Sequence, residues 1–533
     1  MKHNSFFKYP VLAIVVLYFC NSCSNSLNID PTNALMTSTF YQTESQINDA
    51  LNGLYGSLKP IAKYQFCLSE MRSDNVWIMA DVKQNDYVDI CTFNSDGLLT
   101  DNTIKTCWAD YYATIAAANL LLDKIDNVTF SRSDTKLQYK AETRFIRALA
   151  YFDLVRFFGN IPLTDHSITT DEAFSLGQSP AADIYEKIIV PDLVYAVANL
   201  AEKATDFLGA TRSERVTNVA AKALLGKVYL TMAGFPLYQT DKQSMATALF
   251  KEVIDYAETN NMFWAADMDE WNKMWLHEND NKYFIFEIQY IAAKDEGNTM
   301  VNLSVPQNVS SQWCATNLVV GTHIYIEKGL QSHFIERDES TKEYIDLRAD
   351  GTMNLRTSTG EDNESYTPTG NTFYVKFFES KVKRAALGYS DMEAQIVDRT
   401  YWPQNWPILR LEDIMLLYAE CVGATDEGYR MLNKIRTRAG LEALSGLTED
   451  EFQKAVDNER RYELAEEGHR WHDLVRHNTF VETIKNMFYN DDPTVDGTYA
   501  AFANRVNENM YLYPIPLSQI EVRQGLYKQN DGY

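Results

Sequence analysis

Apolar residues recur with the period of an α-helix over much of this chain, and this pattern constrains the fold more than any other feature. Within residues 215–234 an apolar side chain returns at every fourth position, from Val216 through Leu224 to Met232. This spacing gives a helix one continuous apolar stripe that can pack against a neighbour. Gly234 marks the end of this predicted helix. The same period predicts helices over residues 46–58, 106–125, 137–158, 181–200, 245–259, 411–423, 426–439 and 449–477.

Several of these predicted helices follow one another as pairs joined by short turns. Small residues such as Ala148, Ala150, Ala220 and Ala221 stand where neighbouring helices could approach closely. Helix–turn–helix units of the tetratricopeptide kind stack in this way and build a continuous core. The expected fold class is mostly α, with tetratricopeptide-like helical repeats forming one scaffold, an irregular loop-rich region and a few short strands.

The helical period is lost between residues 260 and 405. Within this region, residues 283–290 and 372–378 are rich in aromatic and β-branched side chains, which predicts two short strands. Irregular segments on a rigid frame are common places for binding surfaces. We expect one domain with helical-repeat blocks at about residues 40–259 and 406–490, and with about residues 260–405 inserted as the ligand-binding region. The helices within residues 106–234 and 411–477 should pack together into one core.

The composition narrows the possible partners. The chain has 533 residues and is 45% hydrophobic, which excludes a disordered protein. It carries 49 Lys and Arg against 73 Asp and Glu, a formal net charge of −24. An acidic surface repels phosphate backbones, so nucleic acid is not an expected partner. Aromatic residues make up 13% of the chain, which suggests rings available to stack on a ligand.

The first residues have the features of a secretory signal peptide. A lysine-containing start precedes an apolar run over residues 11–19, which is too short to span a bilayer. Serines flank Cys23 just after this run, as at a bacterial lipoprotein processing site. We predict that residues 1–22 are removed, that Cys23 is lipidated, and that residues 23–533 form a single domain. Plain secretion with an unmodified Cys23 is the alternative.

The other cysteines do not form a recognisable site. Beyond the signal peptide they are odd in number and lack the spacing of zinc ligands. They are therefore predicted to be buried apolar residues: Cys67, Cys91, Cys107, Cys314 and Cys421. No cofactor is expected.

A series of sequence blocks resembles the SusD/RagB-like family of outer-membrane nutrient-binding lipoproteins. In the family's order, the blocks lie at residues 141–162, 215–230, 409–420 with 432–440, 459–476, and 513–516 through 529–533. The resemblance implies a lipid-anchored, surface-exposed protein of the cell outer membrane that is not an enzyme. It also implies that the chain captures an oligosaccharide or another nutrient and delivers it to a SusC-like TonB-dependent transporter.

The block at residues 459–476 could be interpreted as a metal site. His469, His472 and Asp473 would share one face if the block were a single helix. The block lacks the His-Glu-x-x-His pattern of metalloproteases, and the resemblance explains these residues as a packing motif. No metal is therefore expected.

The same block carries a pair of carboxylates that could serve a glycosidase. Glu463 and Glu467 lie one helical turn apart, but the neighbouring arginines should keep both ionised, which does not suit a general acid. We interpret the block as charged ridges that fix helix packing, with an ion pair from Glu466 to Arg470. No catalytic residue is assigned.

The aromatic residues provide the candidate binding site. Sugar rings stack on flat side chains, while nearby polar groups bond their hydroxyls. Trp77 follows Asp74 and Asn75 in a predicted loop, and Trp313 with Tyr325 offers the same chemistry in the irregular region. These five are the predicted ligand-binding residues, with Trp77 and Trp313 exposed on one side of the helical frame.

The remaining tryptophans and two other functions stay as alternatives. Core positions are predicted for Trp108, Trp406 and Trp471, whereas a second platform or a buried helical face would suit Trp264, Trp271 and Trp275. Besides a glycan receptor, the chain could be a surface glycoside hydrolase with an all-α catalytic fold. It could also be a helical-repeat scaffold that binds only protein.

Overall fold

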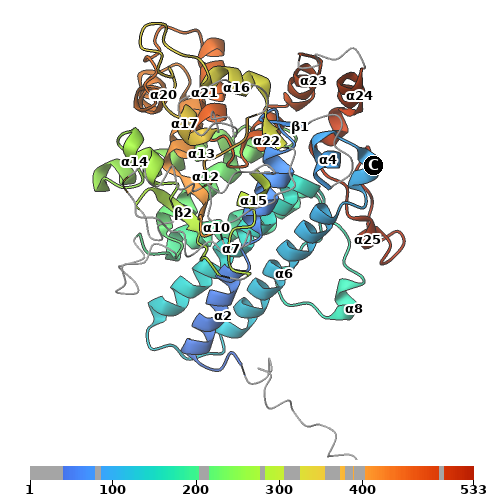
Figure 1. The fold of residues 1–533 in the computed structure, drawn as a ribbon. Coiled ribbons are helices and arrows are strands. Elements are labelled where there is room, and N and C mark those ends of the chain that lie inside the picture. The colour runs from blue at the N-terminus through green and yellow to red at the C-terminus, as the bar shows by residue number, and fades with distance from the viewer. Residues whose placement is uncertain are drawn as a thin grey trace, which may run out of the picture.

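The computed structural model describes residues 40–78, 86–202, 215–276, 282–293, 295–304, 324–353, 372–378, 388, 402–490 and 497–533 (Figure 1). Helices dominate these ranges and the strands are short, as the sequence predicts. No helix among the described residues is long and apolar enough to cross a membrane. The lipidation site predicted at Cys23 and the binding residue predicted at Trp313 lie outside the described ranges.

The N-terminal block is built around one central helix. Its helices are α2 (Glu44–Gly56), α3 (Ile61–Gln65), η1 (Phe66–Glu70), α4 (Asp86–Cys91), α5 (Ser95–Leu98), α6 (Asn102–Ile125), α7 (Ser133–Phe158), α8 (Thr170–Ala173), α9 (Ala181–Ile184), η2 (Tyr185–Ile189), α10 (Val190–Asn199), α12 (Asn218–Ala233) and α13 (Lys242–Asn260). Buried residues occupy all sides of α7, because α2, α6, α10 and η2 pack around it.

The C-terminal block is a second group of helices. It contains α19 (Leu411–Val422), α20 (Asp426–Arg438), α21 (Glu449–Glu463), α22 (Arg470–Arg476), α23 (Phe480–Asn490), α24 (Thr498–Arg505), η3 (Glu508–Tyr511) and α25 (Leu517–Ile520). Threonine side chains cap the starts of α20 and α21, where Thr425 accepts from Gly428 N and Thr448 accepts from Glu451 N.

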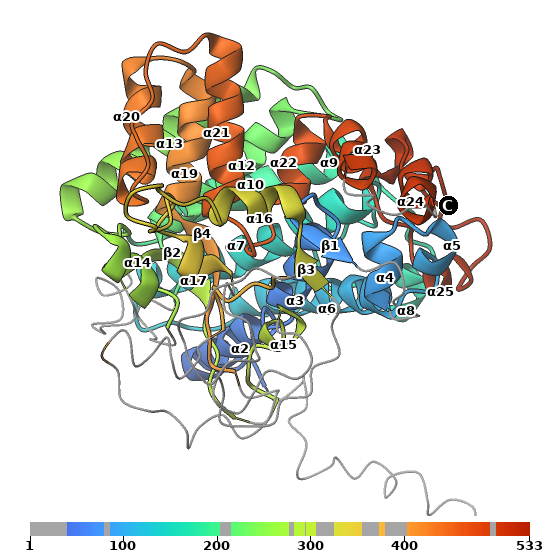
Figure 2. The ribbon, with the colours of Figure 1, turned by 45° about the horizontal axis from the view of Figure 1, so that its top comes forward.

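The two blocks pack against each other. In Figure 2, α13 lies beside α19 and α20, although long stretches of chain separate them. Lys227 of α12 reaches Asp413 of α19, with 2.7 Å between Nζ and Oδ2. Residues of both blocks belong to one buried hydrophobic cluster.

The remaining described elements are short helices, which lie between the blocks, and four strands, of which the middle two lie between the blocks and the first and last belong to the blocks themselves. These are α14 (Met268–Lys273), α15 (Val301–Ser304), α16 (Lys328–Phe334), α17 (Ala349–Thr352), β1 (Val76–Ile78), β2 (Phe284–Ile288), β3 (Ile324–Ile326) and β4 (Trp406–Arg410). β1 pairs with β3, and β2 pairs with β4, both antiparallel. The strand predicted over residues 283–290 is confirmed as β2. The strand predicted over residues 372–378 is wrong, because this segment makes only the isolated bridge from Tyr374 to Met353.

The single helix predicted over residues 449–477 is two helices with a turn between them. The break lies between α21 and α22, where Glu466 and Gly468 both have positive φ angles, 73° and 74°. A Cβ at residue 468 would stand 2.7 Å from the carbonyl oxygen of Gln65, so only glycine fits this close approach. The ion pair predicted from Glu466 to Arg470 is consequently absent, and Arg470 instead binds Asp74 and Asp457.

Most tryptophans belong to the interior. The core positions predicted for Trp108, Trp406 and Trp471 are confirmed, although Trp406 lies in β4. Trp271 and Trp275 are also buried, which excludes them from an exposed platform. Among the described cysteines, Cys67, Cys91 and Cys107 are buried as predicted, and Cys421 is partly buried.

Candidate functional site

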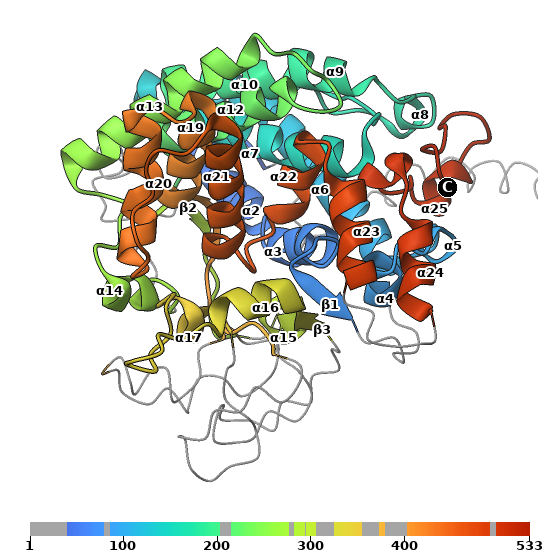
Figure 3. The same cartoon turned by 90° about the horizontal axis from the view of Figure 1, so that it is seen from above.

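The β1–β3 pair holds two of the predicted ligand-binding residues directly opposite each other. Trp77 of β1 pairs with Tyr325 of β3, so both side chains project from the same face of the ribbon. Figure 3 shows this ribbon beside α16 and near α23 and α24. Tyr325 is partly exposed at this face, whereas Trp77 lies beneath neighbouring aromatic rings. Tyr325 is therefore the more accessible ring of the pair.

The prediction that Trp77 projects from a loop as an exposed ring is wrong. Trp77 is only 4% exposed and lies within a strand. Its ring centroid is 4.3 Å from that of Tyr499 and 6.4 Å from that of Phe488. Lys328 at the start of α16 places its ammonium 5.3 Å from the Trp77 ring centroid, a cation–π contact. Trp77 thus supports the ribbon from the inside.

Asp74 is likewise buried, where a glycan could not reach its carboxylate. Its Oδ1 lies 2.7 Å from Arg470 Nε, and its Oδ2 lies 3.3 Å from Arg461 Nε. Burial by itself would raise the pKa of Asp74, but Arg461 and Arg470 outweigh burial and lower it to about 2. Asp74 is therefore ionised at neutral pH and anchors two arginines.

Asn75 uses its side-chain amide inside the protein as well. Its Nδ2 donates to Glu70 Oε1 at 2.8 Å, and its Oδ1 accepts from Arg461 Nε at 2.9 Å. Arg461 also donates to Glu327, whose carboxylate caps the first turn of α16. The expectation that Asp74 or Asn75 bonds ligand hydroxyls directly is therefore contradicted, because both are engaged in a frame that fixes β1 to α16 and α21.

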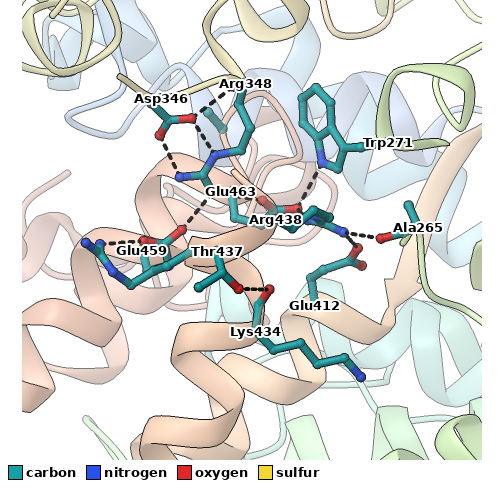
Figure 4. Close-up of polar contacts among 12 residues, drawn as sticks. Ala265, Trp271, Asp346, Arg348, Glu412, Lys434, Thr437, Arg438, Glu459 and Glu463 are labelled. Carbon is teal, nitrogen blue, oxygen red and sulfur yellow. Dashed lines mark hydrogen bonds and ion pairs between the residues drawn. The ribbon is translucent and has the colours of Figure 1, made fainter. Parts of the chain in front are cut away.

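A larger buried ion network lies deeper in the protein (Figure 4). Glu463 at the end of α21 binds three guanidinium groups, with Nη–Oε distances of 2.8 Å to Arg348, 3.0 Å to Arg410 and 2.7 Å to Arg438. Its Oε1 also accepts from Trp271 Nε1 at 3.1 Å. Burial favours the neutral acid, but the arginines outweigh it and hold the pKa of Glu463 well below its usual range.

This network confirms that Glu463 is ion-paired, although with other arginines than those expected from the sequence. A general acid must hold a proton near neutral pH, and Glu463 remains ionised. Its neighbour Glu467 pairs with Arg410 and Lys376. Glu463 lacks the proton, and neither carboxylate has the exposure, that glycoside hydrolysis requires, so the pair is structural.

The three residues considered as metal ligands, His469, His472 and Asp473, do not act together. His469 precedes the first turn of α22, and burial, with Lys227 nearby, lowers its pKa to about 3. Asp473 binds Arg460 and Arg476. Among the described residues, no group of three or more His, Cys, Asp or Glu side chains could hold a metal ion.

Sequence reasoning missed the contribution of the C-terminal helices to this site. Two aromatic rings cover Trp77, that of Phe488 from α23 and that of Tyr499 from α24. These three rings form an aromatic wall behind Tyr325. Lys328 adds a cation at the edge of the same wall. The available signal was the apolar period of residues 480–490, but nothing in the local sequence relates that segment to Trp77, about 400 positions earlier in the chain.

The fold and the sequence blocks match known proteins over nearly the whole chain. A model described as the SusD family matches residues 267–533, and one described as starch-binding associating with outer membrane matches residues 27–230. SusD-like protein P25 of Formosa agariphila is 24% identical, with 98% of this chain and 99% of that protein covered.

Solved structures agree with these matches. A SusD homolog from Bacteroides thetaiotaomicron superposes with a TM-score of 0.74 at 22% identity, covering 93% of this chain and 98% of that one. A laminarin-binding SusD-like protein gives a TM-score of 0.69 at 24% identity, covering 92% and 100%. At these identities the structural likeness shows the shared fold, and the family model extends over half of the sequence. The chain belongs to the SusD family.

Proposed function

We propose that this chain is a non-enzymatic glycan receptor, anchored to the outer membrane through a lipid on Cys23, that passes oligosaccharide to a SusC-like TonB-dependent transporter. Membership of the SusD family carries the proposal. The match of residues 27–230 to a starch-binding model associated with the outer membrane supports both the ligand class and the location. The name of one structural neighbour, a laminarin-binding protein, supports the same ligand class.

The contact surface for the glycan is proposed at the β1–β3 ribbon, on the face that carries Tyr325. Tyr325 is the partly exposed ring there, and Lys328 lies over the ring of Trp77, the partner of Tyr325 in the ribbon. Trp313, twelve positions before Tyr325, is proposed from the sequence alone as a second stacking ring. The proposed role of Trp77, Asp74 and Asn75 is indirect. These buried residues hold the ribbon, and with it Tyr325, in place and do not contact the ligand.

Two assays on the full-length chain separate this proposal from its alternatives. A glycan array identifies the ligand, and a reducing-end assay on the same glycans tests for hydrolysis. A receptor binds at least one glycan and releases no reducing ends. Release of reducing ends would identify a hydrolase, whereas a blank array with retained co-purification of the transporter would identify a protein-binding scaffold.

A further inference from the structure

A cavity of about 240 Å³ is lined by no residue of the β1–β3 ribbon. It is enclosed by the C-terminal end of α7, by η2, by the loop after α12, by α22 and by the last residues of the chain. Ligand pockets for drug-sized molecules measure roughly 300–1,000 Å³. This cavity is smaller, and its volume suits a ligand of about one sugar ring.

Hydrogen bonds between distant segments hold the rim of the cavity in shape. Asn160, after α7, accepts from Ala181 N at 2.9 Å and, through its carbonyl, from Gln178 Nε2 at 2.8 Å. Gln178 in turn accepts from Lys528 N at 2.7 Å, which ties the C-terminal segment across the opening. On the opposite side, Phe235 N donates to the carbonyl of Arg476 at 2.9 Å. The rim is therefore preformed.

Polar atoms at the lining lack partners within the protein. His472 Nε2 is buried and makes no hydrogen bond to any described residue. The hydroxyl groups of Tyr185 and Tyr511 also make none, although both residues line the cavity. A buried polar atom without a partner, such as His472 Nε2, destabilises the empty cavity. A ligand that supplies donors and acceptors here would remove that destabilisation.

The cavity carries no unbalanced charge that would select an ion. Arg156 is paired with Asp153, and Arg476 donates to Glu420 at 2.7 Å. At the rim, Lys528 lies 3.3 Å from Asp531. Burial, together with Arg156, holds the pKa of His472 well below its usual range, so its imidazole is neutral. The lining therefore favours a neutral ligand with many hydroxyl groups.

Aromatic rings give the cavity an apolar side as well. Phe235 and Tyr511 meet edge to face with centroids 4.9 Å apart, and Tyr185 lines the same space. Hydroxyl-bonding groups beside flat rings match a pyranose, which has polar edges and an apolar C–H face. We propose that this cavity is a second site, which binds one neutral sugar ring, free or at the end of a glycan, independently of Tyr325.

Saturation-transfer difference NMR on the full-length chain tests the proposal directly. The chain is kept in a detergent without a sugar headgroup, and the probes are D-glucose, D-galactose, D-mannose and D-xylose. The matched probes are D-glucuronate and D-galacturonate. They differ from D-glucose and D-galactose only in carrying a carboxylate at C6. We expect saturation transfer to at least one neutral sugar, and a Kd at least about fivefold weaker for its acid. Transfer to none of the neutral sugars, or equal affinity for the acid, overturns the proposal.

Two variants place the bound sugar in the cavity. Tyr185→Phe removes only a hydroxyl and should weaken binding by roughly threefold to tenfold, which corresponds to one hydrogen bond. Lys528→Trp closes the rim from an exposed position and should abolish binding, whereas Glu521→Trp, exposed but outside the lining, should not. The backbone contact of Lys528 to Gln178 survives this change, so folding is kept.

The last variant distinguishes the two sites. Tyr325→Ala should leave the Kd for the single sugar unchanged, even where it weakens binding of a longer glycan. Loss of the single-sugar signal in Tyr325→Ala, or its persistence in Lys528→Trp, would assign the sugar to another site and overturn the proposal. Failure of the glycan array with retained single-sugar binding would contradict only the function proposed for Tyr325.

Discussion

Asp74 and Arg470 form a two-point ion pair across 396 positions of the chain, with Nε–Oδ1 and Nη2–Oδ2 distances of 2.7 and 3.1 Å. The pair joins the turn before β1 to the first residue of α22 and is buried on both sides. Arg461 adds a third contact to the same carboxylate. The strand that carries Trp77, and through it Tyr325, is thus fixed to the C-terminal helices.

Replacing Asp74 by Asn should destabilise the protein substantially. Breaking a buried ion pair leaves an uncompensated charge and costs about 3–5 kcal/mol, and the lower end is expected because Arg470 keeps Asp457 as a partner. Urea denaturation of both proteins measures the difference. Asp255→Asn removes an exposed pair with Lys251 and should leave the midpoint unchanged. Equal midpoints for wild type and Asp74→Asn would contradict the anchoring role.

The contribution of Asp74 should disappear in acid. Its pKa is about 2 in the folded protein against a usual 3.8, so its stabilisation is complete above about pH 4 and is lost as the pH falls through about 2. The difference in unfolding free energy between wild type and Asp74→Asn should therefore narrow over this range. A difference that stays constant down to about pH 2 would show that the carboxylate charge does not matter.

Glu466 should produce the opposite pH dependence. Burial, with some help from Glu70, raises its pKa from 4.5 to about 8, although Lys376 opposes the shift. Because the folded protein keeps this proton while the unfolded chain loses it, stability should fall as the pH rises from about 5 to about 8. Glu466→Gln should flatten this slope, and the exposed Glu521→Gln should not. Equal slopes for wild type and Glu466→Gln would contradict a neutral Glu466.

Trp77 and Tyr325 should respond to truncation in opposite ways. Trp77→Ala opens a cavity behind the ribbon and should cost about 3–5 kcal/mol of stability. Tyr325→Ala should cost about 1 kcal/mol of stability but lower glycan affinity by about 1–3 kcal/mol, as expected for an aromatic contact residue. Thermal melts and glycan titrations of both variants measure these effects. An unchanged affinity in Tyr325→Ala would remove this residue from the site.

Cys23→Ala tests the lipid anchor. Without an acyl chain the domain loses about 0.8 kcal/mol of membrane attachment for each buried methylene group. The variant should move to the soluble fraction with an unchanged melting temperature, whereas Cys20→Ala should remain in the membrane. Retention of Cys23→Ala in washed outer membranes would show that this cysteine does not anchor the protein.

Local periodicity was sufficient to predict most of the helices. α6, α7, α12, α13, α19 and α20 each match a predicted range within a few residues, because their apolar stripes arise from residues close in sequence. The turn between α21 and α22 was missed, since it depends on the approach of Gly468 to the backbone of Gln65. Contacts of this kind leave no periodic signal.

The candidate site was harder to predict for a related reason. The polar Asp74 and Asn75 before an aromatic residue suggested an exposed loop, yet Asp74 is buried because Arg461 and Arg470 arrive from the far end of the chain. β1 exists because it pairs with β3, about 250 positions later. The resemblance to the SusD/RagB-like family identified the fold, but it could not rank the aromatic residues by exposure.

Affinity electrophoresis tests most directly whether the chain is a glycan receptor. The full-length chain is run through native gels that contain laminarin, starch or other polysaccharides, with an unrelated protein of similar charge as the control. We expect the chain to be retarded in at least one polysaccharide gel and to release no reducing ends. The retardation should be weaker for Tyr325→Ala. Unchanged mobility in every gel, with the protein folded by circular dichroism, would contradict a glycan receptor.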